Sequence, residues 1–398
     1  MITTRTKAIT VIFIINIALE LSIVAAMVAG PTFQRLFSLS KTELGICLGA
    51  TSVGMALFAP LVGHYTHNYG PSRMLIAGLV GAIIGVLLVS ASSGLTLLLT
   101  GLIVTGIFGA FIANANDTIT AELYPEQLRK IMALASGLWF SSSAISAPIM
   151  GTWLEISHNR GWSFWSFRVL FLTISLLFGI CLLLTVTMIL KKVEMNISLK
   201  EHSERRSGSN VKSRDSERGW FWIPILGLFH GVFITVLFAW INPMVQSRFA
   251  ANEIQGSIVV GVVSFGIGFG RFCLWRFKIE KDDRLVLSLS GLLGAGLLIL
   301  GLLSPTFLLT TITLCIASFF CSATFPCLLT MVGTRFPGSK AKVYGYLNAS
   351  VASAGLLGPA LVGILADAGL PLWVAIGLSP LAGLTLAALS FIWKITSP

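Results

Sequence analysis

The chain has 398 residues, of which 55% are hydrophobic and only 11% are charged, and its mean hydropathy is +0.88. This composition excludes an ordinary water-soluble protein and indicates a polytopic membrane protein. The net charge of +11 does not indicate a nucleic-acid partner, because the basic residues are confined to short segments between apolar runs.

Apolar runs of about 20 residues recur along the whole chain, and each is long enough to cross a bilayer as an α-helix. With a cytoplasmic N-terminus, all but five of the 27 Lys and Arg residues fall on the cytoplasmic side. The five exceptions are Arg35, Lys41, Arg160, Arg168 and Arg248. We therefore expect both termini in the cytoplasm and a multi-pass protein of the bacterial inner membrane. The twelve predicted spans are 8–30, 43–63, 73–93, 96–118, 131–153, 167–190, 220–242, 256–275, 285–303, 306–330, 344–366 and 371–393.

The first run is too long for the hydrophobic core of a cleavable signal peptide and lacks the usual small-residue cleavage site, so we expect it to remain in the protein. All six cysteines fall inside predicted spans without the close spacing of metal ligands. We expect them to be packing residues, and we predict neither a disulfide framework nor a metal site.

Glu20 lies near the middle of the first run, and no other charge occurs between Ala8 and Gly30. A carboxylate at that depth is costly unless it is protonated, paired or facing a water-filled cavity. A proton-coupled carrier needs a group of this kind, which can gain and lose a proton as it faces each side in turn. We therefore predict that Glu20 couples proton movement and that Asn16, one turn earlier on the same face, contacts substrate. The alternative is a permanently protonated Glu20 bonded to a neighbouring helix.

Further polar and aromatic residues occur at depth in other spans. Asn114 and Asn116 in the fourth span and Asn348 in the eleventh could bond a polyhydroxylated solute, and Trp139 in the fifth could stack on a sugar ring. We predict that these four residues bind substrate. Each of them could also simply pack or pin a helix.

A long hydrophilic segment from Lys191 to Arg218 is rich in Lys, Arg, Ser and Glu. We expect a cytoplasmic linker at 191–219 that joins a first six-helix half, 1–190, to a second, 220–398. An offset of about 212 residues superimposes Pro31 and Gln34 on Pro243 and Gln246. Further pairs at nearly the same offset are Phe37 and Phe249, Ala147-Pro148 and Gly358-Pro359, and Glu155 and Asp367. The chain is therefore predicted to be a duplicated six-helix unit, all α-helical and pseudo-symmetric.

Two candidate residues lie in the second half. The repeat maps His230 of the seventh span close to the depth of Glu20, so we predict that it takes part in proton coupling or bonds a substrate hydroxyl. A histidine beside Gly231 could also bond a backbone carbonyl between helices. Arg271 in the eighth span could grip an anionic substrate, or could extend to the nearby cytoplasmic interface.

The segment between the second and third spans reads GHYTHNYGPSR, from Gly63 to Arg73. It resembles the G-x-x-x-D-R-x-G-R-K-R motif of the major facilitator superfamily, and the resemblance extends over essentially the whole chain. It implies the major facilitator fold of two six-helix bundles, with alternating access to a central site. Gly63, Gly70 and Arg73 match the motif, but His67 replaces its Asp, which puts the associated salt bridge between the halves in doubt.

Additional motifs are similar to those of the fucose-permease-like branch, whose characterised members are proton-coupled sugar carriers. They are N-x-N-D followed by A-E-L-Y-P-E-x-x-R from Asn114 onward, Gly270-Arg271, Phe325-Pro326 and Phe336-Pro337-Gly338. The same Gly-Arg pair occurs in carboxylate carriers of the superfamily. Ala147 to Gly151 is a partial match to a motif linked to antiport.

Three classes of function are considered for a polytopic membrane protein: a secondary carrier, a membrane-embedded enzyme, and a non-transporting sensor or scaffold. An enzyme would need a paired nucleophile and base, a metal cluster or a phosphate loop, and the spans contain none. A scaffold would need a large soluble domain. We predict a monomeric secondary transporter without a cofactor that takes up a small sugar-like or carboxylate solute with protons. The alternative is a proton-coupled efflux antiporter for a drug-like compound or secreted metabolite.

Overall fold

The computed structural model describes residues 4–124, 128–190, 221–276, 282–335 and 340–396, and these residues form helices without any β-strand. Ten helical spans are long and apolar enough to cross a membrane. The two remaining predicted spans, 43–63 and 131–153, correspond to the long helices α3 and α6. The prediction of an all-α, twelve-span protein is confirmed. The helices are α1 (Thr4–Val28), α2 (Gly30–Phe37), α3 (Lys41–Tyr69), α4 (Pro71–Ser90), α5 (Leu95–Leu123), α6 (Leu128–Asn159), α7 (Ser166–Leu190), α9 (Trp222–Phe249), α10 (Glu253–Arg276), α11 (Asp283–Leu303), α12 (Phe307–Cys321), α13 (Thr324–Arg335), α14 (Lys340–Asp367), α15 (Leu372–Ala375) and α16 (Leu378–Thr396).

The tenth predicted span, 306–330, is not a single helix. It breaks at Ser322 and Ala323 into α12 and α13. Pro326 explains the position of the break, because a proline ring clashes with the carbonyl four residues earlier, which here belongs to Ser322. Pro326 then sits in the first turn of α13, where its missing N–H costs little. A second helix, α13, therefore begins at Thr324 within this span, inside the bundle.

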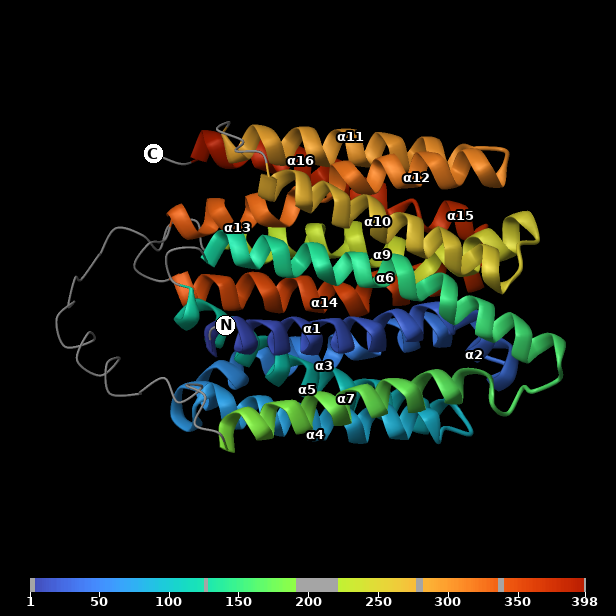
Figure 1. The fold of residues 1–398 in the computed structure, drawn as a ribbon. Coiled ribbons are helices and arrows are strands. Elements are labelled where there is room, and N and C mark those ends of the chain that lie inside the picture. The colour runs from blue at the N-terminus through green and yellow to red at the C-terminus, as the bar shows by residue number, and fades with distance from the viewer. Residues whose placement is uncertain (1–3, 125–127, 191–220, 277–281, 336–339, 397–398) are drawn as a thin grey trace.

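The first half (α1 to α7) and the second half (α9 to α16) lie side by side, with the helices roughly parallel to one long axis (Figure 1). Helix α1 begins and α16 ends at the same end of the bundle, and α2 and α15 lie at the opposite end, called here the distal end. The predicted linker, 191–219, lies outside the described residues, so the domain boundaries stay a prediction.

The five basic residues predicted to face away from the cytoplasm all lie toward the distal end, on or beside α2, α3, α6, α7 and α9. Two of them stabilise helix ends there. Arg168 donates to the carbonyl oxygen of Ser92 just after α4, at 2.6 Å. Arg248 donates to Leu302 and Ser304 at the end of α11. A cation at a helix C-terminus satisfies carbonyl groups that have no partner within the helix. Which side of the membrane the distal end faces stays a prediction.

The most extensive contacts between the halves run along two helix pairs, α3 with α14 and α6 with α10. In both pairs a glycine allows the two helix backbones to approach closely. A Cβ atom at Gly45 of α3 would lie 2.4 Å from the carbonyl oxygen of Pro359 in α14. A Cβ at Gly151 of α6 would lie 1.9 Å from the Oγ of Ser257 in α10. Small residues of this kind let helix backbones come close inside a membrane.

Candidate functional site

Glu20 is buried between α1 and α6, with only 4% of its surface exposed. The hydroxyl of Ser143 donates to its Oε1 atom, and the Trp139 side chain also interacts with the carboxylate. Trp139 and Ser143 are four residues apart on α6, so the helix presents both to the same neighbour. The carboxylate therefore has partners that accommodate it within the membrane-spanning bundle.

Arg271 extends from α10 of the second half toward the same place. Its guanidinium carbon lies 4.9 Å from the centre of the Phe140 ring on α6, so the side chain faces the interface between the halves. It interacts electrostatically with both Glu20 and His230. Its Nε atom is buried without a hydrogen-bond partner, and such a donor is costly unless it is satisfied by a ligand or water. Arg271 thus interacts with Glu20 of the first half and with His230 of its own half.

His230 is also buried, with 5% of its surface exposed, and its Nδ1 lies 3.0 Å from the hydroxyl of Thr324 at the start of α13. That hydroxyl donates its proton to the carbonyl oxygen of Cys321, at 2.7 Å. The hydroxyl oxygen is then the acceptor for His230, which assigns the ring proton to Nδ1 and leaves a lone pair on Nε2. Phe325 stacks on the imidazole with ring centres 5.4 Å apart. The break in the tenth span therefore positions His230.

Asn16 and Asn116 form a pair between α1 and α5. The Nδ2 of Asn116 donates to the Oδ1 of Asn16 at 2.8 Å, and the Oδ1 of Asn116 is buried without a partner. Asn16 lies one helical turn from Glu20. We call the residues around Glu20 the Glu20 cluster; they are Glu20, Trp139, Phe140, Ser143, His230, Arg271 and Thr324. The two amides extend this cluster toward α5. The unpaired oxygen of Asn116 is a candidate acceptor for a hydroxyl or N–H of a solute.

The other predicted substrate residues lie apart from these contacts. Asn114 is half-buried two positions before Asn116, on a different face of α5, and Asn348 is exposed on α14. In the segment from Gly63 to Arg73, whose motif we predict to take part in gating, Gly70 joins α3 to α4 with a φ of 85°, a backbone conformation that favours glycine. Arg73 is exposed in the first turn of α4, and the surroundings of Gly63 and of the His67 side chain lie outside the described part of the structure.

Three members of the cluster were not predicted as site residues: Phe140, Ser143 and Thr324. The spacing of Ser143 from Trp139 was a usable signal, because residues four apart share a helix face. Thr324 could be found only by recognising that Pro326 restarts a helix beside His230. No feature of the sequence around Phe140 indicated that it would contact a site residue.

A family model for the major facilitator superfamily matches residues 12–281. The chain belongs to the major facilitator superfamily. It is a multi-pass membrane protein of that superfamily, and its fold and family are those of transporters rather than of any catalytic family. The major facilitator fold is also that of two solved structures. One is the xylose transporter XylE from E. coli in an inward open conformation, with a TM-score of 0.77, 14% identity and coverage of 98% of this chain and 96% of that one.

The second solved structure is a bacterial homologue of the human lysosomal transporter Spinster, in an inward-facing and occupied conformation. Its TM-score is 0.72 at 15% identity, with coverage of 99% of this chain and 97% of that one. At such low identity, both structures establish the fold alone.

The relatives found by sequence include tetracycline resistance proteins and a TsgA homologue. The class E tetracycline resistance protein of Escherichia coli is 31% identical over 27% of this major facilitator chain and 26% of its own length. The class B protein of the same organism is 30% identical over 34% of this chain and 36% of its own. The chain therefore spans about a quarter to a third of these two relatives. A TsgA homologue from Buchnera aphidicola is 24% identical over 80% of this chain and 77% of its own length.

Replacing Arg271 with lysine tests whether this side chain contacts an anionic solute. If a carboxylate is carried, we expect its binding to weaken by roughly tenfold or more, because the planar guanidinium fork is lost while the charge is kept. Isothermal titration of the purified protein measures the change. The matched control is Arg73→Lys, at an exposed arginine outside the cluster. Equal affinity in the Arg271→Lys protein would remove Arg271 from the binding site.

Proposed function

We propose that this chain is a proton-coupled secondary transporter that moves a small polar solute, sugar-like or carboxylate, across the bacterial inner membrane by alternating access. The observation that carries the proposal is Glu20, a buried carboxylate that accepts a hydrogen bond from Ser143 and interacts electrostatically with Arg271 of the other half. When the halves rock, the distance between Glu20 and Arg271 changes. A carboxylate whose cationic partner moves away binds a proton more readily, and one whose partner returns releases it.

The polar and aromatic side chains around Glu20 favour a hydroxylated or carboxylated solute. Arg271 offers an N–H with no partner, Asn116 offers an oxygen with no partner, and Trp139 and Phe140 offer ring faces. A donor, an acceptor and flat apolar surfaces together suit a sugar ring or a small carboxylate. Membership of the fucose-permease-like branch, suggested by the sequence motifs, is part of this proposal.

A second candidate function is proton-driven export of a drug-like compound. The specific observation in its favour is the 30% and 31% identity to two tetracycline resistance proteins over parts of the chain. The same Glu20 and Arg271 pair would serve an antiporter, in which substrate and proton displace each other.

Proton flux in reconstituted vesicles separates the two functions. A thermal-shift screen with sugars, carboxylates and tetracycline first identifies a ligand, because a bound ligand stabilises the folded state. The ligand is then added to one side of proteoliposomes that contain a pH-sensitive dye. Uptake by symport predicts that protons move in the same direction as the solute, and export by antiport predicts the opposite direction. Solute movement without any proton movement would refute both.

A further inference from the structure

A cavity of about 540 Å³, called here the distal pocket, lies at the distal end between α2 and α3 of the first half and α9 and α15 of the second. Its size is within the range of sites that bind small molecules. Six of its lining residues form three pairs that the internal repeat relates, each pair 212 positions apart: Pro31 and Pro243, Gln34 and Gln246, and Arg35 and Ser247. The two halves therefore contribute equivalent positions to one cavity, which is separate from the Glu20 cluster.

The orientation of the Gln246 amide follows from its neighbours. Asn242 donates through Nδ2 to the carbonyl oxygen of Val28 at 3.0 Å, so its Oδ1 is the acceptor that faces Gln246. The Nε2 of Gln246 donates to that Oδ1 at 2.9 Å and to the carboxylate of Glu253 at 3.0 Å. Both N–H groups of the Gln246 amide are then used. Its Oε1 has no donor among the described residues and is left as a hydrogen-bond acceptor for the distal pocket.

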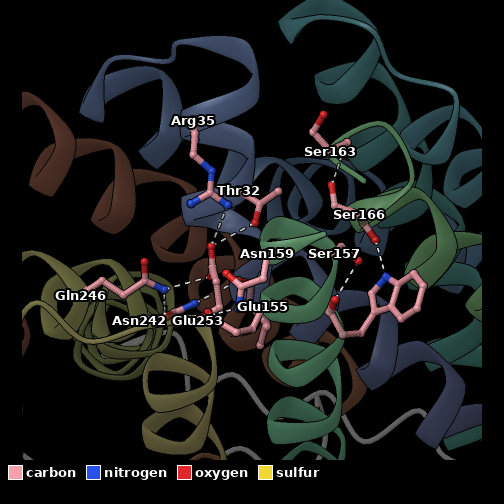
Figure 2. A network of polar contacts seen from close by, with 12 residues as sticks. Thr32, Arg35, Glu155, Ser157, Asn159, Ser163, Ser166, Asn242, Gln246 and Glu253 are labelled. Atoms are coloured by element: carbon pink, nitrogen blue, oxygen red, sulfur yellow. Dashed lines mark hydrogen bonds and ion pairs between the residues drawn. The ribbon is translucent and has the colours of Figure 1, made fainter. Parts of the chain in front are cut away.

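The guanidinium of Arg35 is positioned by the same carboxylate. Its Nη2 donates to the Oε1 of Glu253 at 3.1 Å, and Figure 2 shows Arg35 and Gln246 both directed at Glu253. A guanidinium has five N–H groups, of which this bond uses one. The Arg35 side chain is 43% exposed, so its other N–H groups can reach a ligand. The buried Glu253 therefore fixes two polar groups of the distal pocket, one from each half.

Two further side chains of the distal pocket have hydrogen-bonding groups to spare. The ammonium group of Lys41 donates to the carbonyl oxygen of Ala366 over a long 3.5 Å, which leaves two of its three donors. The Gln34 side chain makes no hydrogen bond within the described part of the chain, although it is half-buried. An amide offers both a donor and an acceptor, so Gln34 can bond a hydroxyl group in either sense.

The charges around the distal pocket are arranged with the cations on its wall. Glu253 pairs with Arg35, and Asp367 interacts electrostatically with Lys41. Neither carboxylate is among the residues that line the cavity, and none of the described lining residues is acidic. An anion in the cavity would therefore meet N–H donors of both cations without a carboxylate in the wall to repel it.

We propose that the distal pocket is a second binding site, which takes a small hydroxylated carboxylate of the sugar-acid class. Arg35 and Lys41 bind the carboxylate, because a guanidinium and an ammonium group form charge-assisted hydrogen bonds with it. Gln34 and Gln246 bind the hydroxyl groups. The site is independent of the Glu20 cluster, and binding there requires no proton movement.

Protection of an introduced cysteine tests for a ligand in the distal pocket itself. Ser247→Cys places a thiol at an exposed lining position, and mass spectrometry follows its alkylation by a maleimide in the full chain in lipid nanodiscs. The probe is gluconate. An occupied pocket excludes the reagent, so gluconate at about ten times its Kd should slow alkylation about tenfold. The chain without the added cysteine gives the background from the six native thiols.

Arg35→Gln and Lys41→Gln, each combined with Ser247→Cys, should raise the concentration of gluconate needed for protection by roughly tenfold or more. Each removes a charge-assisted hydrogen bond to the carboxylate. Glucose, which has the hydroxyl groups without the carboxylate, should protect only at far higher concentration. Arg271→Lys changes the Glu20 cluster and should leave protection unchanged. Ser93→Cys, in the exposed loop between α4 and α5, is the matched control and should react equally fast with and without gluconate.

Alkylation of Ser247→Cys at the same rate with and without gluconate would overturn the distal site, and equal protection by glucose would overturn its preference for a carboxylate. Loss of protection in Arg271→Lys would also overturn it, because the effect would then come from the Glu20 cluster. If Arg35→Gln fails to fold because Glu253 loses its cation, Lys41→Gln still supplies the result. The measurement uses no proton gradient. Protection in a chain without proton-coupled transport would therefore sustain the distal site while refuting the proposed function.

Discussion

Replacing Glu20 with glutamine is expected to abolish proton-driven accumulation of solute while preserving exchange of solute across the membrane. Glutamine keeps the size of the side chain and can still accept a hydrogen bond from Ser143, but it cannot gain or lose a proton. Exchange requires only that the loaded carrier change its orientation, whereas accumulation requires a coupled proton. Counterflow and pH-driven uptake, measured in the same proteoliposomes, separate the two activities.

Glu43→Gln provides the matched control, because it makes the same chemical change at a carboxylate near the end of a helix. Glutamine can replace glutamate in the capping box that Glu43 forms with Ser40, so both activities should survive. If the Glu20→Gln protein still concentrates solute in response to a pH gradient, Glu20 is a structural residue. Loss of both exchange and accumulation in a folded protein would likewise contradict a role limited to coupling.

Gly106→Ala and Gly45→Ala are expected to have different effects, although the added Cβ atom would meet backbone atoms at both sites. The first should lower the stability of the protein, and the second should change its conformation. A Cβ at Gly106 of α5 would lie 1.9 Å from the carbonyl oxygen of Thr51 on α3, inside the first half. These two helices cannot separate without unfolding that half, so we expect a destabilisation of about 3 kcal/mol or more. Gly45 meets Pro359 across the interface between the halves, and separation of the halves can relieve that clash.

Gly106→Ala should therefore lower the yield of folded protein and its melting temperature. Gly45→Ala should keep a melting temperature close to that of the native chain. It should instead lengthen the distance, measured by pulsed electron paramagnetic resonance, between spin labels attached at Ser93→Cys and Pro305→Cys, in exposed loops of the two halves. Gly179→Ala on α7, where no atom beyond the neighbouring backbone of the same helix lies within 4 Å of the added Cβ, is the control for both measurements. Equal thermal destabilisation by Gly45→Ala and Gly106→Ala would show that the interface does not open.

Much of the fold could be predicted from the sequence, because a helix that crosses lipid must be long and apolar. Helix breaks could not be predicted in the same way. Pro326 ends a helix, whereas Pro148, Pro243 and Pro359 lie inside continuous ones. Whether a proline breaks a helix depends on whether neighbouring groups satisfy the freed carbonyl, and those neighbours come from other parts of the chain.

The candidate site was predictable where one residue was anomalous on its own. The energetic cost of burying Glu20 is visible in a single helix, and the repeat placed His230 at a similar depth. The direction of Arg271 was not visible, since its distance from the helix end also allowed it to reach the interface. Its contact with Phe140 depends on how α10 packs against α6, which is a property of the pair of halves.

The glycine-lined pairs α3 with α14 and α6 with α10 also bear on the energetics of the conformational cycle. Backbones that meet on glycine bury less apolar side-chain area and immobilise fewer side chains than large residues would, so parting them exposes less surface and frees fewer side chains. The open and closed forms can then lie close in free energy. Moving a two-state equilibrium from 1:99 to 99:1 takes about 5.5 kcal/mol of differential binding, so a small free-energy gap lets a small solute shift the populations. An interface built from large interlocking side chains would bury more apolar area and so widen that gap.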